Sequence, residues 1–193
     1  MLINHNLIPI SATVSFVMLF ALNLRPISKI ESKLLRLILV LIVGGVTLYL
    51  PIYKGCTLVQ LLRGVMGDLS ITTLLILFSL LIQKIFRLTR PFNLNPSFAI
   101  VVTMLGSLLY MSTLGFIDLD VYSFGYFPKG TMLLAVCLLE LFLLDYARSY
   151  AWIWLIALIS FYFKFESSNN LWDYLFDPLL WLIAIISFFR RQA

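Results

Sequence analysis

Five charged side chains are candidates for a polar cluster at one end of the predicted helices: Arg63, Asp68, Asp118, Asp120 and Lys129. Arg63 and Lys129 could bind the phosphate of an anionic lipid headgroup or a lipid-linked substrate, because charged donors form strong hydrogen bonds with phosphate. Asp68 or Asp118 could then act as a general base or orient a donor. The structural alternative is that Asp68 caps a helix, Arg63 snorkels at an interface, and the other acids end a helix in water.

A separate signal is Glu140, which lies inside the apolar run of residues 131–144. An ionisable group in hydrocarbon is costly, and it usually faces the interior of a helix bundle or a cavity. Glu140 is therefore a candidate proton or cation relay, or a partner for a basic group on another helix. The alternative is that this run is shallow, which would place Glu140 near the cytoplasmic interface, shortly before Asp145.

The sequence contains few residues that could support other kinds of catalysis. His5 is the only histidine, and the sequence has no Cys/His cluster with metal-ligand spacing, so we expect no metal site. There is no P-loop, dinucleotide fingerprint or G-x-S-x-G motif, so we also expect no cofactor. Cys56 and Cys137 do not make a disulfide framework, and we expect both to be free thiols.

The composition indicates a chain that is solvated by lipid. Hydrophobic residues make up 62% of the 193 residues and charged residues only 12%, with a mean hydropathy of +1.01. A soluble domain carries about 25% charged residues, so this chain has too little polar surface to cover a globule in water. We therefore expect an all-α integral membrane protein that forms one domain over residues 1–193.

The apolar runs predict about seven transmembrane helices. We expect them at residues 7–24, 37–52, 69–82, 97–117, 131–144, 151–163 and 171–189. The fifth and sixth runs are short, at about 21 Å of helix. They could instead form a re-entrant hairpin, which would leave five spans. Either count places the amino terminus outside the cell and the carboxyl terminus in the cytoplasm.

The distribution of basic residues supports this orientation, because loops on the cytoplasmic side of membranes are enriched in Lys and Arg. Ten basic residues then lie inside: Arg25, Lys29, Lys33, Arg36, Lys84, Arg87, Arg90, Arg148, Arg190 and Arg191. Four lie outside: Lys54, Arg63, Lys129 and Lys164. We attribute the net charge of +5 to this topology and not to nucleic-acid binding.

The expected outer face carries further polar side chains. Its other charged residues are Lys54, Glu166, Asp173 and Asp177, and its aromatic residues include Tyr53, Tyr122, Tyr126 and Trp172. Apolar residues at helical spacing predict a short interfacial helix before Gly67, and Asp68 is the expected N-cap of the third span. Within the second span, Gly44 and Gly45 could let two helix backbones approach closely.

The stretch from Arg63 to Ser70 follows two predicted helices, and its Gly67-Asp68 pair opens the third. This arrangement resembles the membrane region of the phosphoglycerol and phosphoethanolamine transferases of the alkaline-phosphatase superfamily. The resemblance covers only these residues and their topological position. The spacing from Arg63 to Asp68 is wider than in that family, and the family's soluble catalytic domain has no counterpart in the 193 residues.

Three functions remain open on the sequence alone. We expect a small, non-catalytic subunit of the bacterial inner membrane that binds another membrane protein or a lipid, anionic lipids included. The first alternative is a membrane-embedded transferase or hydrolase that acts on a lipid or lipid-linked phosphate at the outer leaflet. The second is a small proton-coupled transporter or flippase that uses Glu140.

Overall fold

A computed structural model describes residues 7–24, 27, 29–88, 94–126, 136, 139–140 and 142–189. This part of the chain is mostly helical, which confirms the all-α fold class. Its helices are α1 (Leu7–Asn23), α3 (Lys33–Tyr49), α4 (Leu58–Met66), α5 (Ile71–Phe86), α6 (Pro96–Thr113), the 3-10 helix η1 (Tyr122–Gly125), α8 (Arg148–Tyr162), α9 (Leu171–Leu175) and α10 (Pro178–Phe189). A short antiparallel pair, β1 (Pro51–Tyr53) and β2 (Cys56–Thr57), precedes α4.

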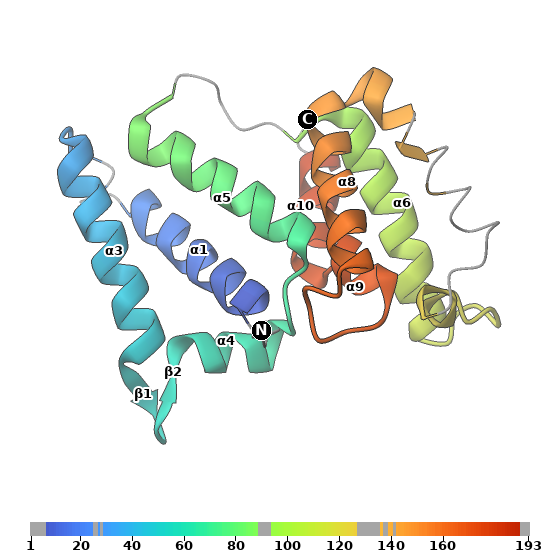
Figure 1. Cartoon of the computed structure of the whole chain (residues 1–193), viewed down its shortest axis with the longest axis horizontal. Coiled ribbons are helices and arrows are strands. Elements are labelled where there is room, and N and C mark those ends of the chain that lie inside the picture. Colours follow the sequence, from blue (N-terminus) through green and yellow to red (C-terminus); the bar gives the residue numbers. More distant parts are fainter. Residues whose placement is uncertain are drawn as a thin grey trace.

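The long helices run between two opposite edges of the molecule (Figure 1). We call the edge at which α3, α6 and α8 begin the upper edge, as it lies in that view. The lower edge carries the β1–β2 pair, α4, η1 and α9. Helices α1, α5 and α10 run in the opposite direction and end toward the upper edge. Helices α1, α3, α5 and α6 therefore alternate in direction, as do α8 and α10, whereas α6 and α8 run the same way.

The helices form two packed groups that are joined through α5. In the first group α1 packs against both α3 and α5, and in the second α6 packs against α10 and α8 against α9. Helix α5 also contacts α8 and α9, so it links the groups. The largest apolar core lies in the second group, where Phe98, Trp154 and Tyr174 are almost fully buried. A smaller core around Val40 and Leu81 holds the first group together.

Local sequence signals explain where most of these helices begin. The side chain of Ser32 caps α3, and Thr57 with Gln60 forms a reciprocal capping box at the start of α4. Asn95 caps α6 immediately before Pro96, and Asn170 caps α9. These polar side chains satisfy backbone N–H groups that have no partner inside a helix. The short helix expected before Gly67 is present as α4.

The expected cap of the third span, Asp68, does not cap α5. Helix α5 begins at Ile71, two residues after the expected start at residue 69. Its N-cap is Ser70, which has an extended backbone and a side-chain oxygen 3.2 Å from the Thr73 nitrogen. Gly67 takes a positive φ of 74°, which turns the chain away from α4. Asp68 and the buried Leu69 then form a short connection. Asp68 instead pairs with a residue of α4.

The last expected span, residues 171–189, is not one continuous helix. Helix α9 ends at Leu175 and α10 begins at Pro178. Proline disfavours the helical conformation in the residue before it and lacks the N–H that would continue the ladder of hydrogen bonds. Asp177 therefore lies at a break, and its Oδ1 accepts a hydrogen bond of 2.8 Å from the Leu180 nitrogen. An Asp-Pro pair is a common helix start, and α10 begins at Pro178 of this pair.

The number of membrane-spanning helices stays a prediction. Of the described helices, α6 alone is both long and apolar enough to cross a membrane by length and composition, and α1, α5 and α10 are shorter apolar helices. The core helix of a soluble protein can meet the same criterion. Within the expected fifth span, residues 136, 139–140 and 142–144 are helical, and the others of that span lie outside the described residues.

Two close contacts hold the first group of helices in place. Arg36 is buried, and its guanidinium donates hydrogen bonds to the carbonyl oxygens of Ile30 and Lys84, which ties the start of α3 to the end of α5. A Cβ atom on Gly44 would lie 1.9 Å from the Met18 Cε of α1, so the expected close approach occurs here. A Cβ atom on Gly45 would meet no neighbouring atom of the described residues within 4 Å, so the structure shows no close approach at that position.

Candidate functional site

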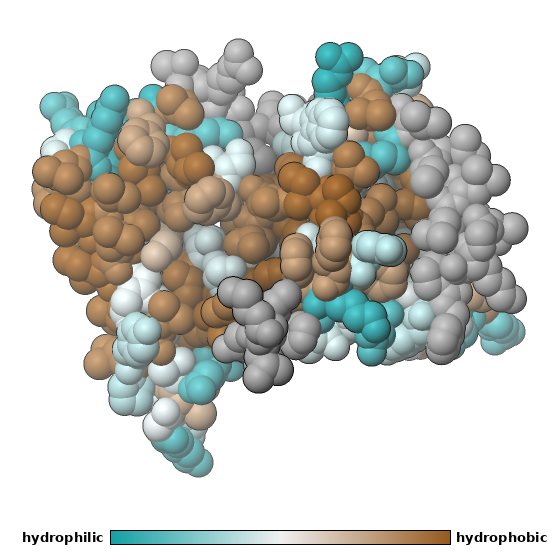
Figure 2. All heavy atoms as spheres, viewed as in Figure 1, coloured by the Kyte–Doolittle hydropathy of each residue, from teal (hydrophilic) through white to brown (hydrophobic). Residues whose placement is uncertain are grey.

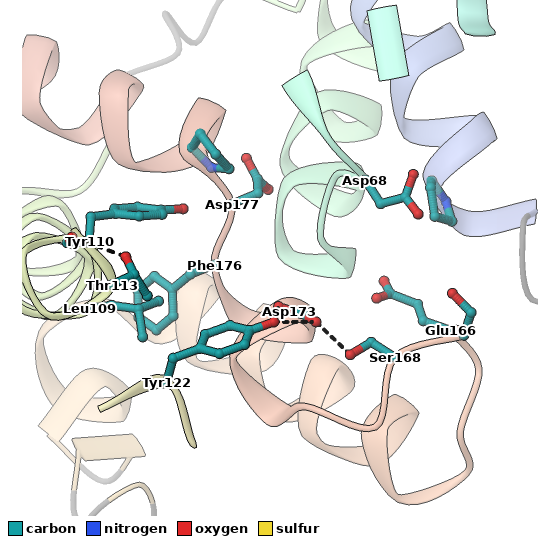
Figure 3. A pocket seen from close by; sticks show the side chains of 13 residues that line it. Asp68, Leu109, Tyr110, Thr113, Tyr122, Glu166, Ser168, Asp173, Phe176 and Asp177 are labelled. Carbon is teal, nitrogen blue, oxygen red and sulfur yellow. Dashed lines mark hydrogen bonds between the residues drawn. The ribbon is translucent and has the colours of Figure 1, made fainter. Parts of the chain in front are cut away.

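An acidic pocket of about 300 Å³ lies at the lower edge, where the two groups of helices meet (Figure 3). Four carboxyl side chains line it: Asp68, Glu166, Asp173 and Asp177. They come from the connection before α5, the loop at residues 163–170, helix α9 and the break between α9 and α10. None of the described residues that line the pocket is basic. We call this site the acidic pocket.

Asp177 is the structural centre of the pocket wall. Its side chain is 2% exposed, and Oδ2 accepts hydrogen bonds from the Ser70 nitrogen at 3.0 Å, the Ser70 hydroxyl at 2.7 Å and the Thr73 hydroxyl. Its Oδ1 accepts the bond from Leu180 at the start of α10. One carboxylate therefore faces the amino-terminal ends of both α5 and α10, where the helix dipole favours negative charge.

Asp173 is held by hydroxyl groups from two other segments. The Tyr122 hydroxyl lies 2.9 and 3.1 Å from its two oxygens, and the Ser168 hydroxyl donates to Oδ2. Burial, followed by the charge of the Asp173 carboxylate, raises the pKa of Tyr122, so this phenol stays a hydrogen-bond donor. The Asn170 side-chain amide donates to the Tyr122 carbonyl at 3.0 Å, which fixes η1 against the start of α9.

Glu166 differs from the other carboxyl groups because it has an unsatisfied atom. The residue is only 6% exposed, and its Oε1 has no hydrogen-bond partner within the described part of the chain. Its backbone is fixed, since its nitrogen donates to the Tyr174 hydroxyl at 3.0 Å and that hydroxyl donates to its carbonyl oxygen at 3.2 Å. A buried, unpaired carboxyl oxygen is unfavourable and calls for an explanation at each site where it occurs.

The surroundings of Glu166 change its acidity. Burial, followed by the negative charges of Asp173, Asp68 and Asp177, raises the pKa of Glu166 to about 8. A hydrogen bond with the backbone of Ile71 opposes this shift. With the pocket empty, the Glu166 carboxyl is therefore mostly protonated at neutral pH, although an exposed glutamate would be ionised.

This shift predicts a pH-dependent stability. Between the ordinary pKa of 4.5 and the folded pKa of about 8, the unfolded chain loses the Glu166 proton before the folded chain does. Rising pH therefore lowers the free energy of unfolding over that range, at about 1.4 kcal/mol for each unit of pKa shift. We expect Glu166→Gln to match the wild type in melting temperature near pH 5 and to exceed it at pH 8.5. Melting curves of the purified proteins across this range measure the difference, and parallel curves would contradict the prediction.

The five residues of the predicted polar cluster are only partly brought together. Arg63 and Asp68 form an ion pair, in which the guanidinium Nε and Nη2 each lie 2.6 Å from Asp68 Oδ1. Asp118 and Asp120 are exposed in the connection between α6 and η1, and neither lines the acidic pocket. Asp120 accepts a hydrogen bond of 3.0 Å from the Ser123 nitrogen. Lys129 lies outside the described residues.

Glu140 is separate from the acidic pocket. It is 8% exposed, and neither oxygen of its carboxyl group has a hydrogen-bond partner among the described residues. It does not line the acidic pocket. Glu140 and Glu166 are therefore two buried carboxyl groups with unpaired oxygens in different places.

The sequence analysis predicted that Glu166, Asp173 and Asp177 lie on the same outer face as Asp68, but it did not identify them as candidate site residues. A usable signal was the Asp177-Pro178 pair, which marks a helix start inside an apolar run. Nothing in the sequence indicated that residues 163–170 would fold over the start of α5, because the loop is an irregular polar segment. The close grouping of these acids is a consequence of tertiary structure.

The four carboxyl groups that line the acidic pocket could stabilise a positive charge. Among the described residues, no group of three or more His, Cys, Asp or Glu side chains could hold a metal ion. The four carboxyl groups are spread around the pocket and do not converge on one point. Comparisons of the chain with protein-family models, curated proteins and solved structures find no match. The functional assignment therefore depends on the geometry of the chain itself.

Proposed function

We propose that this chain is a multi-pass protein of a cell membrane, with the bacterial inner membrane as the expected location. Its proposed role is that of a subunit that binds a lipid or another membrane protein through the acidic pocket. The observation that carries the membrane assignment is the large apolar surface of the helices between two polar edges.

Helix α3 gives the clearest view of this apolar surface. Leu34, Leu41 and Tyr49 are 67%, 62% and 83% exposed, although they lie along one helix of an otherwise packed group. Figure 2 shows hydrophobic residues gathered over the side of the molecule and hydrophilic residues toward its upper and lower edges. Monomeric soluble proteins rarely expose contiguous apolar patches larger than a few hundred Å². A lipid environment accounts for this surface.

The charges at the two edges support the proposed orientation. The described residues Lys33, Lys84, Arg87 and Arg148 lie at the ends of helices that meet the upper edge. All four carboxyl groups of the acidic pocket lie at the lower edge. Because cytoplasmic loops are enriched in basic residues, the upper edge is assigned to the cytoplasm and the acidic pocket to the outer surface.

The direction of the described helices supports seven spans over five. Tyr126, just after η1, lies at the lower edge, and Arg148 begins α8 at the upper edge. These two positions on opposite edges agree with the fifth span expected from the sequence. Helix α8 then runs from the upper edge to the lower edge, as we expect of a spanning helix in the proposed seven-span arrangement.

Glu140 gives specific support to a second candidate function, a proton-coupled transporter or flippase. Its buried carboxyl group has no hydrogen-bond partner among the described residues, and such groups inside membranes often relay protons or cations. The geometry gives less support to a transferase or hydrolase of lipid phosphates. One side of the Arg63 guanidinium is already paired with Asp68, and the acidic pocket would repel an anionic group.

Thiol labelling tests the proposed topology. In a background in which Cys56 and Cys137 are replaced by serine, Leu119→Cys places a thiol at the lower edge and Leu88→Cys places one at the upper edge. The native side chains are 49% and 55% exposed, which makes them a matched pair. We expect a membrane-impermeant maleimide to label Leu119→Cys in intact cells and to label Leu88→Cys only after permeabilisation.

Two results would contradict the topology. One is labelling of both thiols in intact cells at similar rates. The other is release of the wild-type chain into the aqueous fraction by alkaline carbonate, which removes peripheral proteins but leaves spanning proteins in the membrane. Both measurements are independent of what the acidic pocket binds.

A further inference from the structure

We propose that the acidic pocket binds an organic ammonium group, with the Glu166 carboxylate as its direct counter-charge. This inference rests on the proposed function in one respect, namely that the pocket is a binding site. It adds the chemical class of the ligand, which nothing in the sequence indicated. The expectation from the sequence was an anionic lipid held by Arg63 and Lys129.

The first support is the unpaired Oε1 of Glu166. The side chain is more than nine-tenths buried, and Figure 3 shows its carboxyl group pointing into the space between Asp68 and Asp173. The carboxyl groups of Asp173 and Asp177 are already occupied by hydroxyl and backbone donors of the protein. Among the buried carboxyl groups of the pocket, Glu166 is thus the one with capacity for a ligand, and Asp68 is 47% exposed and paired with Arg63.

The second support is the charge of the surroundings. The groups that act electrostatically on Glu166 are Asp173 on α9, Asp68 before α5 and Asp177 before α10, and all three are acids. The basic residue that contacts one of these acids is Arg63, which forms an ion pair with Asp68. Several acids facing one buried carboxyl group make the empty pocket unfavourable when all are ionised, and a bound cation removes that cost.

The third support is the aromatic wall of the pocket. Tyr110, Tyr122 and Phe176 lie across the pocket from Glu166 (Figure 3). Aromatic faces attract organic cations through their quadrupole, and they add little to the binding of a small, strongly hydrated metal ion. Dispersed carboxyl groups with aromatic rings therefore favour a bulky ammonium group over a metal ion, for which the described residues offer no ligand cluster.

The raised pKa makes the sign of the pH dependence a test. A cation binds the ionised form of Glu166, so binding should strengthen as pH rises and level off above about pH 8. Below that value only the ionised fraction is competent, and the apparent affinity falls by about tenfold for each pH unit. A neutral ligand that hydrogen-bonds to the protonated carboxyl group would give the opposite slope.

The test uses the full chain in nanodiscs of phosphatidylglycerol, with tetramethylammonium as the probe because its charge does not change with pH. Tryptophan fluorescence reports binding, since the ring of Trp172 lies 5.8 Å from that of Phe176 and the ring of Trp181 lies 4.9 Å from that of Tyr110, both of which line the pocket. Since Glu166 is about 1% ionised at pH 6 and half ionised at pH 8, we expect the dissociation constant to fall by about fiftyfold over this range. We expect tert-butanol, an uncharged molecule of similar size, to produce no saturable signal.

Two variants locate the binding site. Glu166→Gln should weaken tetramethylammonium binding at pH 8.5 by at least about tenfold, because it removes the counter-charge with little change in shape. Glu140→Gln makes the same change at a buried carboxyl group outside the pocket, and it should bind like the wild type. Equal binding by both variants, binding that strengthens at low pH, or no binding by the folded wild type would overturn the proposal.

The source of the ammonium group is decided by a second nanodisc composition. If a lipid headgroup supplies it, phosphatidylethanolamine in the nanodisc should compete with tetramethylammonium and raise its apparent dissociation constant. If a free small molecule supplies it, the two compositions should give the same constant. Failure of the topology test with intact ammonium binding would reject the membrane assignment and leave the pocket assignment in place.

Discussion

Asp177→Ala is expected to destabilise the chain by about 3 to 5 kcal/mol, because it removes a helix cap and leaves several buried donors without an acceptor. The substitution removes the acceptor for the Ser70 nitrogen and hydroxyl, the Thr73 hydroxyl and the Leu180 nitrogen, all in a buried site. The start of α10 loses its cap, and Ser70, the cap of α5, loses the carboxylate that accepts its nitrogen and hydroxyl hydrogen bonds. For a chain of this size the loss corresponds to a fall in melting temperature of about 6 to 20 °C.

The matched control for Asp177 is another aspartate of the same pocket. Asp68 is 47% exposed and makes one ion pair with Arg63, and exposed pairs contribute about 0 to 1 kcal/mol. Asp68→Ala should therefore lower the melting temperature only slightly. Tryptophan fluorescence during heating measures both variants in one detergent. Similar losses for the two variants would mean that the hydrogen bonds that Asp177 accepts at the starts of α5 and α10 add little to stability.

Gly125→Ala should also have a large effect, because η1 passes very close to α9. A Cβ atom at this position would lie 1.8 Å from the Asn170 Oδ1 and 2.7 Å from the Trp172 Cδ1. Asn170 is fully buried, and that oxygen accepts the Trp172 nitrogen at 3.0 Å to cap α9. The added methyl group must displace this cap, so we expect a loss of about 2 to 4 kcal/mol from overpacking and the lost cap together.

Gly44→Ala is the control for this prediction. Its Cβ atom would lie 1.9 Å from Met18 Cε, but that atom is the far end of a flexible side chain that can rotate away. We expect a loss well below that of Gly125→Ala, measured by the same melting experiment. A larger loss at Gly44 than at Gly125 would show that the contact between α1 and α3 is more rigid than the contact between η1 and α9.

The sequence predicted helices where local signals and apolar runs agree. Helix α6 follows Asn95-Pro96, a cap and a first-turn proline, and the structure places it within one residue of the expected start. Helix α4 was expected from its apolar spacing. In both cases the information lies within a few consecutive residues, so no knowledge of the tertiary fold is needed.

The misses come from contacts between distant segments. Asp68 was expected to cap the third helix because it is a good capping residue at a plausible position. Ser70 caps the helix instead. Its hydroxyl donates a hydrogen bond to Asp177, more than a hundred residues later in the chain, and this contact holds the Ser70 side chain in place. The break before Pro178 was visible as a helix start, but its apolar surroundings suggested one continuous span. The grouping of Glu166 with Asp173 depends on the loop at residues 163–170, whose path no local pattern specifies.

The break in the last helix has a consequence for which ions reach the pocket. Helix α10 has 12 residues, about 18 Å of rise, whereas the hydrocarbon layer is about 30 Å thick. In the proposed arrangement, Asp177 and the pocket beside it then lie below the level of the lipid headgroups. An alkali ion entering that depth would have to give up its hydration shell. Caesium should therefore displace tetramethylammonium at lower concentration than lithium, in the order of their dehydration energies.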